Sequence, residues 1–143
     1  AIAYKESQGK YKKINSLGYL GKYQFGSETL KTIGIHNRAA FLNSPELQEK
    51  AFIALLTKNK GELKDEIEKY EGTVMNGIRV TESGILAAAH LGGVGSVKKY
   101  LRNNGKRYLR DAYGTSLRSY MKAFGGYDTS FIAADSDATV KDI

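Results

Sequence analysis

The sequence predicts a mainly α-helical domain with one small β-hairpin near residues 73–80, and three observations predict it. Apolar residues recur three and four positions apart through most of the chain, as on the buried face of a helix. β-branched residues flank Asn76-Gly77, the dipeptide that most strongly favours a tight hairpin turn. The 143 residues contain no internal repeat and no linker, so one domain over 1–143 is expected.

Three helical segments are expected in the first half of the chain. The residues before Gly9 have the character of a helix end, and we expect its start, and a longer parent chain, upstream of this sequence. An amphipathic helix is expected from about 23 to 33. Ser44 is the expected N-cap of a long helix that reaches about residue 70, with a break at Gly61.

The second half of the chain predicts shorter helices separated by glycines. Thr81 is expected to cap a helix over 83–91, which is small and apolar on nearly all sides and therefore belongs at the centre of the fold. Glycines interrupt it before a helical stripe resumes at 94–101, and a last helix is expected from about Thr115 to 124. The tail 128–143 has little periodicity and is expected to dock loosely or to fray.

Composition narrows the function classes. The chain has no cysteine, which excludes disulfides and thiolate chemistry, and its two histidines are too far apart in sequence to suggest a metal centre, so no metal and no cofactor are expected. No apolar run approaches the roughly 18 residues of a membrane span, and no signal peptide is recognisable. A net charge of +7 favours a polyanionic partner, for which nucleic acid, anionic lipid and bacterial cell wall all qualify.

Glu6 is the first residue that could carry chemistry, since it lies between an apolar run and a Gly-containing turn. A carboxyl group shielded by apolar neighbours at a helix end gains a raised pKa and can act as a general acid near neutral pH. A solvated charge near a helix end is the alternative, and the local sequence alone does not overturn it.

Two further stretches could form a binding site. In GYLGKYQFG, glycines allow close backbone approach while Tyr23 and Gln24 combine an aromatic face with an amide, a mixture that suits a sugar; a glycine-rich turn before a helix is the alternative. In AAAHLGGVG, His90 interrupts a run of small residues. A buried histidine needs a polar partner, for which Glu6 is the candidate, although a hydrogen-bonded core histidine is the more common case.

The segment KKYLRNNGKRYLR interleaves basic and aromatic residues, which is the footprint of nucleic-acid binding. Tyr100 and Leu101 lie on an apolar stripe, however, so the solvated face of a helix explains the pattern better. No nucleic-acid partner is expected.

Three motifs, in order, resemble the lysozyme-like superfamily, and specifically the lytic transglycosylases and goose-type lysozymes that cleave peptidoglycan. The family signature Glu-Ser-x-Gly is matched by residues 6–9, and its Gly-x-x-Gly-x-x-Gln segment is matched by 18–24 at the family's spacing. The third family element, Ala-Ala-Tyr-Asn-Ala-Gly, is matched more loosely by 88–93. These motifs cover about a fifth of the chain.

The resemblance implies a two-lobed helical fold and a single catalytic residue, Glu6, which acts on the β-1,4 bond between N-acetylmuramic acid and N-acetylglucosamine. It also implies that no carboxylate nucleophile is required, because the substrate's N-acetyl group can stabilise the reacting centre. The positions that correspond to substrate-binding residues are Ser7, Asn15, Tyr23, Gln24, His90, Gly92 and Gly93.

This chain departs from the family pattern where His90 replaces a tyrosine that contacts the catalytic glutamate. A cationic imidazole there would oppose the acid role. If a second carboxylate positions water, Glu71 and Glu82, which flank the predicted hairpin, are the candidates. An anhydro-forming lytic transglycosylase is favoured over a hydrolytic muramidase.

The expected protein is a monomer that acts on peptidoglycan glycan strands in the periplasm or facing the cell wall, delivered by a phage or secretion apparatus. Two alternatives stay open. A non-catalytic peptidoglycan-binding module could keep the same fold, and a basic helical nucleic-acid-binding domain is favoured only by the segment after residue 97.

Overall fold

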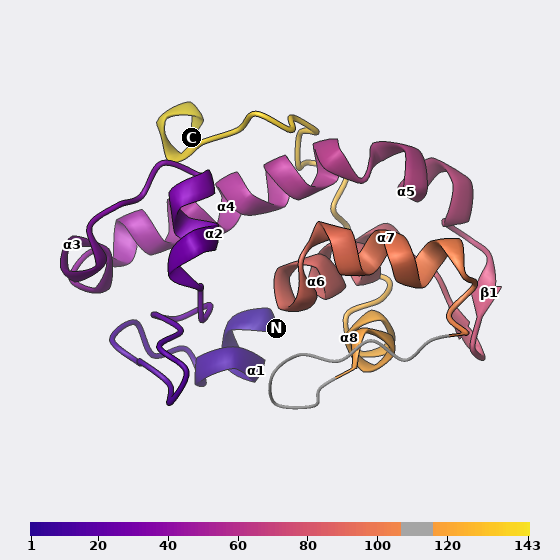
Figure 1. Ribbon diagram of the computed structural model, residues 1–143, viewed down its shortest axis with the longest axis horizontal. Coiled ribbons are helices and arrows are strands. Elements are labelled where there is room, and N and C mark those ends of the chain that lie inside the picture. Colours follow the sequence, from indigo (N-terminus) through magenta and orange to yellow (C-terminus); the bar gives the residue numbers. More distant parts are fainter. Residues whose placement is uncertain (107–115) are drawn as a thin grey trace. The chain divides into compact units, whose positions relative to one another are not determined.

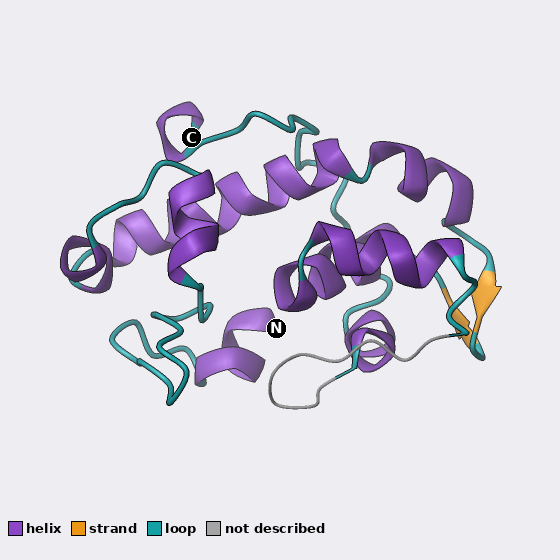
Figure 2. Cartoon of the chain, viewed as in Figure 1, coloured by secondary structure: helices purple, strands orange, loops and turns teal. Residues whose placement is uncertain are grey.

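The computed structural model describes residues 1–106 and 116–143 (Figure 1). The fold is mainly helical with a small two-stranded antiparallel sheet, which confirms the predicted fold class at this level (Figure 2). In the described part of the chain the elements, in order, are α1 (Ile2–Ser7), α2 (Ser27–Thr32), α3 (Arg38–Leu42), α4 (Pro45–Glu62), α5 (Lys64–Tyr70), β1 (Val74–Met75), β2 (Ile78–Arg79), α6 (Glu82–Gly92), α7 (Val94–Arg102), α8 (Leu117–Ala123) and the short 3₁₀ helix η1 (Val140–Asp142).

The chain forms two compact units, and the boundary between them falls within α4. The first unit comprises Ala1–Lys58 and Asp137–Ile143, and the second comprises Asn59–Ser136. Each unit contains its own cluster of buried apolar side chains. Glu6 and the glycine-rich stretch therefore belong to the first unit, while His90 belongs to the second.

In the first unit, α2 begins later than the periodicity predicts. Residues 21–24 form a turn in which Gln24 has a positive φ of 55°, Phe25 bridges to Leu20, and Gly26 is the N-cap of the helix. α3 was not expected, and it begins where the Asn37 side chain accepts a hydrogen bond from the main-chain nitrogen of Ala40. The core of this unit gathers the apolar side chains Leu20, Phe25, Leu30, Ile33, Phe41, Ala51 and Leu55.

In the second unit, the hairpin and the helix breaks follow the predictions closely. β1 and β2 pair antiparallel with Met75 opposite Ile78, and Asn76 and Gly77 form the turn with φ values of 51° and 76°. The long helix breaks at Leu63, two residues after the predicted position, and α5 follows. Thr81 caps α6 by accepting a hydrogen bond from the main-chain nitrogen of Gly84, as predicted.

α6 lies at the centre of the second unit and packs against α7 and α8 (Figure 1). Its residues Ser83 to Ala89 are all buried. Gly84 lets α8 approach closely, because a Cβ atom at this position would lie 2.8 Å from the carbonyl oxygen of Met121. The small residues of α6 are therefore required by backbone packing. α8 begins at Leu117 after the N-cap Ser116, and the predicted start at Thr115 lies outside the described residues.

The tail 128–143, which was expected to dock loosely or to fray, is mostly exposed and makes a few specific contacts. Ile132 and Ala138 are buried, and Lys60 donates hydrogen bonds to the carbonyl oxygens of Thr129 and Ile132 at 3.1 and 2.8 Å. Further on, the main-chain nitrogen of Val140 donates to the carbonyl oxygen of Ile33. Main-chain hydrogen bonds, which leave no trace in side-chain periodicity, hold this segment in place.

Candidate functional site

Glu6 lies in the last turn of α1 and is half-buried. The helix ends at Gln8, which adopts the left-handed conformation with φ 57°, and its main-chain nitrogen bonds back to the carbonyl oxygens of Ala3 and Tyr4. The predicted position of Glu6 at a helix end therefore agrees with the structure. A helix end gives a carboxyl group a defined direction while leaving one side open to a ligand.

Ser7 fixes the end of α1 to the glycine-rich stretch. Its side chain is 1% exposed, and its hydroxyl donates to the carbonyl oxygen of Lys22 at 2.5 Å and accepts from the main-chain nitrogen of Lys10 at 3.1 Å. A hydrogen bond thus joins the motif at residues 6–9 directly to the motif at residues 18–24 within the first unit. In this structure the hydroxyl of Ser7 is used by the chain itself, and its binding of substrate stays a prediction.

The glycine-rich stretch forms a compact loop that its own polar side chains hold together. Leu20 makes antiparallel bridges to both Ile14 and Phe25. The side-chain amide of Gln24 donates to the carbonyl oxygens of Lys13 and Gly21 at 3.2 and 2.9 Å. Because Gln24 is 8% exposed and its amide nitrogen is committed to the loop, its observed role is to shape the loop.

Asn15 also organises this loop, since its side-chain oxygen accepts hydrogen bonds from the main-chain nitrogens of Leu17 and Tyr19, each at 2.9 Å. A pocket of about 440 Å³ lies beside the loop, and it is lined by 17–19, 26–29 and Arg38. Neither Asn15 nor Gln24 lines it. The structure thus gives the glycine-rich stretch a pocket, formed by residues other than those predicted to contact a sugar.

A cluster around Glu49 was missed by sequence reasoning. The Glu49 carboxylate accepts hydrogen bonds from Tyr11 at 3.0 Å, from Lys22 at 2.9 Å and from the hydroxyl of Tyr23. The Tyr23 ring stacks on Phe52 with centroids 3.9 Å apart. Tyr23, predicted to contact substrate, is therefore 8% exposed and uses its hydroxyl within the protein.

Charge and burial set the protonation states in this cluster. Partial burial by itself would raise the pKa of Glu49, but the hydrogen bonds from Tyr23, Lys22 and Tyr11 together hold that pKa below its ordinary value. Burial and the bond to Glu49 raise the pKa of Tyr23, and the bond to Glu49 raises the pKa of Lys22 against the opposing effect of burial. The cluster therefore stays in one charge state, with an anionic Glu49 and a cationic Lys22, across the neutral range.

Gln48, the residue beside Glu49, connects three segments of the first unit. Its side chain is fully buried; the amide nitrogen donates to the carbonyl oxygens of Tyr11 and Phe41, and the amide oxygen accepts from the main-chain nitrogen of Lys22 at 2.9 Å. Both main-chain polar groups of Lys22 are thereby bonded, one to Gln48 on α4 and one to Ser7 on α1. A polar residue at helical spacing from buried Ala51 and Leu55 is the sequence signal that could have found it.

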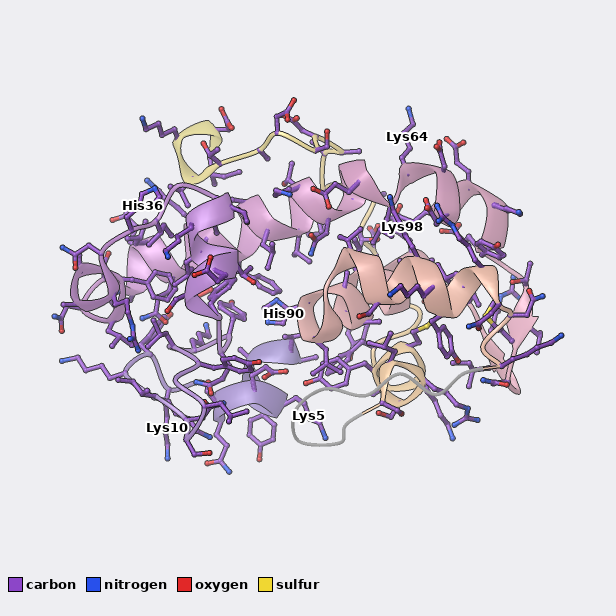
Figure 3. The ribbon with its side chains drawn as sticks, in the orientation of Figure 1. Lys5, Lys10, His36, Lys64, His90 and Lys98 are labelled. Atoms are coloured by element: carbon purple, nitrogen blue, oxygen red, sulfur yellow. The ribbon has the colours of Figure 1, made fainter. Side chains whose placement is uncertain are left out.

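His90 lies in the last turn of α6 in the second unit (Figure 3). The helix ends at Gly92, and Gly93 is its C-cap. His90 is half-buried. Gly93 has a φ of 85° and separates α6 from α7, while a Cβ atom at Gly92 would lie 2.7 Å from a methyl group of Leu117. Both glycines therefore have a structural reason to be present. The predicted contact between His90 and Glu6 stays a prediction.

Glu71 and Glu82, the two candidates for a second carboxylate, line the same pocket of about 860 Å³ in the second unit. Glu82 is 20% exposed, forms an ion pair with Lys60 at 3.2 Å and accepts a hydrogen bond from the hydroxyl of Thr129. Glu71 is exposed at the end of α5. The structure thus brings these two carboxylates to one cavity, although eleven positions separate them in sequence.

The basic segment after residue 97 is partly used inside the second unit. Glu66 is buried on α5 and forms ion pairs with Lys98 at 3.8 Å and with Arg102 at 3.2 Å. Tyr100 and Leu101 are fully buried. Arg107, Tyr108 and Arg110 lie outside the described residues. Two of the basic residues of α7 are therefore engaged in ion pairs with the buried Glu66 carboxylate, which joins α7 to α5.

None of the helices in 1–106 and 116–143 combines the length and the apolar character that crossing a membrane requires. The same residues contain no group of three or more histidine, aspartate or glutamate side chains that could hold a metal ion. No protein family, no curated protein and no solved structure was found to match this chain.

Proposed function

We propose that this chain cleaves the β-1,4 glycosidic bond between N-acetylmuramic acid and N-acetylglucosamine in bacterial peptidoglycan, with Glu6 as its single general acid/base. One observation carries the proposal: the hydrogen bond from the Ser7 hydroxyl to the carbonyl oxygen of Lys22 joins the Glu6 turn to the glycine-rich loop. These are the two stretches whose spacing resembles that of the lytic transglycosylases and goose-type lysozymes.

The positioning of Glu6 supports this role. A general acid must be held in one direction relative to the glycosidic oxygen, since misplacement by about 1 Å can cost a hundredfold in rate. Ser7 lies 1% exposed next to Glu6, and Lys22, to which it bonds, is held in turn by Gln48 and Glu49. A continuous set of hydrogen bonds from α4 thus supports the short helix that carries the carboxyl group.

The proposed reaction has two steps. Protonated Glu6 donates its proton to the glycosidic oxygen as the bond to the anomeric carbon breaks, and the substrate's N-acetyl group stabilises the positive charge that develops there. Ionised Glu6 then takes a proton from the muramyl 6-hydroxyl, which closes onto the anomeric carbon to give a 1,6-anhydro product. If a water molecule supplies the hydroxyl instead, the product is the hydrolysed sugar.

The pocket beside the glycine-rich loop is a candidate subsite for the glycan, because an aromatic residue, Tyr19, and two hydroxyl-bearing residues, Ser27 and Thr29, are among those that line it. Aromatic faces and polar groups together are what a sugar requires. The activity would place the protein where it faces the cell wall, and the net charge of +7 suits the carboxylates and phosphates of that polymer.

The test compares the clearing of purified peptidoglycan by the wild-type chain and by Glu6→Gln. We expect Glu6→Gln to lose at least about a hundredfold in rate, because general acid catalysis contributes that much or more. Equal clearing by the two proteins would rule out the catalytic role of Glu6. Clearing by neither, with wild type still bound to the polymer, would instead favour a binding module.

The released fragments then distinguish the two routes. Mass spectrometry reports 1,6-anhydro products as lighter by one water than hydrolysed ones. We expect the anhydro products.

A further inference from the structure

The pocket that Glu71 and Glu82 line has no role in the reaction proposed above, which needs a single carboxyl group. The pocket measures about 860 Å³ and lies entirely within the second unit, where segments from α4, the end of α5, β2, the start of α6 and the loop after α8 meet. A cavity of this volume is in the range that binds small ligands and peptide segments.

One side of the pocket is a closed network of charges. Lys60 forms an ion pair with Glu82 at 3.2 Å and donates to the carbonyl oxygens of Thr129 and Ile132, and the hydroxyl of Thr129 donates to Glu82. The exposed fractions of the Lys60 and Glu82 side chains are only 15% and 20%. Because the charges of Lys60 and Glu82 are paired with each other, this side of the pocket is a structural wall and leaves no unpaired charge there for a ligand.

The other charged groups of the lining are exposed and of both signs. Arg79 belongs to β2, and its guanidinium lies 4.0 Å from the position that a Cβ atom of Gly72 would occupy. A main-chain hydrogen bond from Gly72 to Val80 at 2.8 Å holds this part of the pocket together. The pocket therefore presents the Arg79 guanidinium near Gly72, just after the end of α5, and its lining also includes the exposed residue Glu71.

The loop after α8 contributes a second carboxylate and an aromatic ring. Asp128 accepts hydrogen bonds from the hydroxyl and the main-chain nitrogen of Ser130, which lower the pKa of its carboxyl group and keep it anionic. The Tyr127 side chain is 57% exposed, while its main-chain nitrogen is held by the hydroxyl of Ser83. The exposed lining of the pocket thus contains one cation (Arg79), two anions (Glu71 and Asp128) and the aromatic ring of Tyr127. Main-chain hydrogen bonds at Gly72 and Tyr127 hold the segments that carry them.

We propose that this pocket binds the end of a short peptide that carries both a free carboxylate and a side-chain ammonium group, with Arg79 receiving the carboxylate and Glu71 and Asp128 receiving the ammonium. A ligand of a single charge would leave one set of these groups without a partner. In the substrate of the proposed function, this chemistry belongs to the diamino acid that ends a peptidoglycan stem peptide, so the identity of the ligand rests on that proposal.

The experiment titrates the wild-type chain with the tripeptide L-alanyl-γ-D-glutamyl-L-lysine and follows main-chain amide resonances by NMR. We expect the shifts to concentrate on Gly72, Val80 and Thr129. Two modified peptides test the charges separately: in one the C-terminal carboxylate of the lysine is amidated, and in the other the side-chain ammonium of the lysine is acetylated. Each is expected to bind about tenfold more weakly, because hydrogen bonds to charged groups are the strong ones in such sites.

Variants then assign each charge to its partner. Arg79→Gln should weaken the unmodified tripeptide about tenfold and abolish the preference for carboxylate over amide, whereas Glu71→Gln should reduce the preference for ammonium over acetyl-ammonium. Lys64→Gln is the matched control, since Lys64 is an exposed cation on α5 that does not line the pocket (Figure 3). All three positions are exposed, so the variants are expected to fold.

Several results would overturn the inference. These are the absence of shifts at the pocket amides, equal binding of the amidated peptide by wild type, and equal weakening by Lys64→Gln and Arg79→Gln. Equal binding of free lysine, which has the same carboxylate and side-chain ammonium without the peptide, would overturn it too. The titration breaks no bond, so its outcome is independent of catalysis. A chain that binds the tripeptide but does not clear peptidoglycan would contradict only the proposed function, and a chain that clears without binding would contradict only this inference.

Discussion

Replacing Gln48 by methionine should separate the polar contacts of this residue from its volume. Methionine has a similar length and fills the same buried space, but it can neither donate to the carbonyl oxygen of Tyr11 nor accept from the main-chain nitrogen of Lys22. The carbonyl oxygen of Phe41, the other principal partner, retains a hydrogen bond from Ser44. Two partly buried main-chain groups are therefore left without their Gln48 partner.

The expected cost follows from those two groups. A buried polar group that loses its hydrogen-bond partner costs about 1–3 kcal/mol, so two such groups cost about 2–6 kcal/mol. Partial relaxation of the loop toward water places the expected loss in the free energy of unfolding near 3 kcal/mol, toward the lower end of that range. Because Ser7 bonds to the same Lys22 residue, we also expect the Glu6 turn to be held less firmly.

The assay is urea unfolding with extrapolation of the free energy to water. Glu46→Gln is the control on the same helix, since it removes only an exposed pair with Lys50 and should cost less than about 0.5 kcal/mol. A loss below about 1 kcal/mol for Gln48→Met would contradict this expectation. It would show that water or another group forms hydrogen bonds with the Tyr11 carbonyl oxygen and the Lys22 main-chain nitrogen when Gln48 is absent.

Three further substitutions test the remaining contacts. Gly21→Ala should lower the free energy of unfolding by about 2 kcal/mol more than Gly9→Ala. Both glycines have a φ near +80°, but only at Gly21 would the new Cβ lie 2.4 Å from the side chain of Gln48. Equal losses in urea unfolding would show that backbone strain alone matters. Glu49→Gln should cost about 1–2 kcal/mol at pH 7, allowing for a side chain that is 40% exposed. Since the pKa of Glu49 is lowered in the folded chain, its contribution is present above about pH 4.5 and is lost as the pH falls through the folded value, so the two stabilities should converge in acid. Gly61→Ala should release the tail, because its Cβ would lie 2.3 Å from a main-chain nitrogen there; unchanged hydrogen exchange in 133–138 would contradict this.

The sequence predicted Glu6 at a helix end before a glycine-rich stretch, and the structure adds a structural use for two neighbouring side chains whose binding of substrate stays a prediction. Ser7 and Gln24 were expected to face substrate, and both are buried and hydrogen-bonded to the main chain. Polar residues in a short motif can serve either purpose, because the same hydroxyl or amide that binds a ligand can also close a loop. Only the burial of each side chain distinguishes the two uses.

Features that depend on adjacent residues could be predicted from the sequence alone. Asn76-Gly77 forms the hairpin turn because both residues tolerate a positive φ, Thr81 caps α6 with its own hydroxyl, and Gly93 ends that helix with a φ of 85°. Each of these depends on interactions within a few positions of the chain, so a local pattern contains the necessary information.

The hydrogen-bond networks that support the two candidate sites are visible only in the tertiary structure. Lys22 bonds to Ser7, 15 positions away, and to Gln48, 26 positions away, while Glu82 bonds to Thr129 across 47 positions. Partners so far apart meet only after the helices have packed, and each of these residue types is common on protein surfaces. The range of the interaction explains the difference. Backbone preferences act between neighbours, whereas the hydrogen bonds that hold the Glu6 turn and the pocket lined by Glu71 and Glu82 form only between segments that meet in the folded chain.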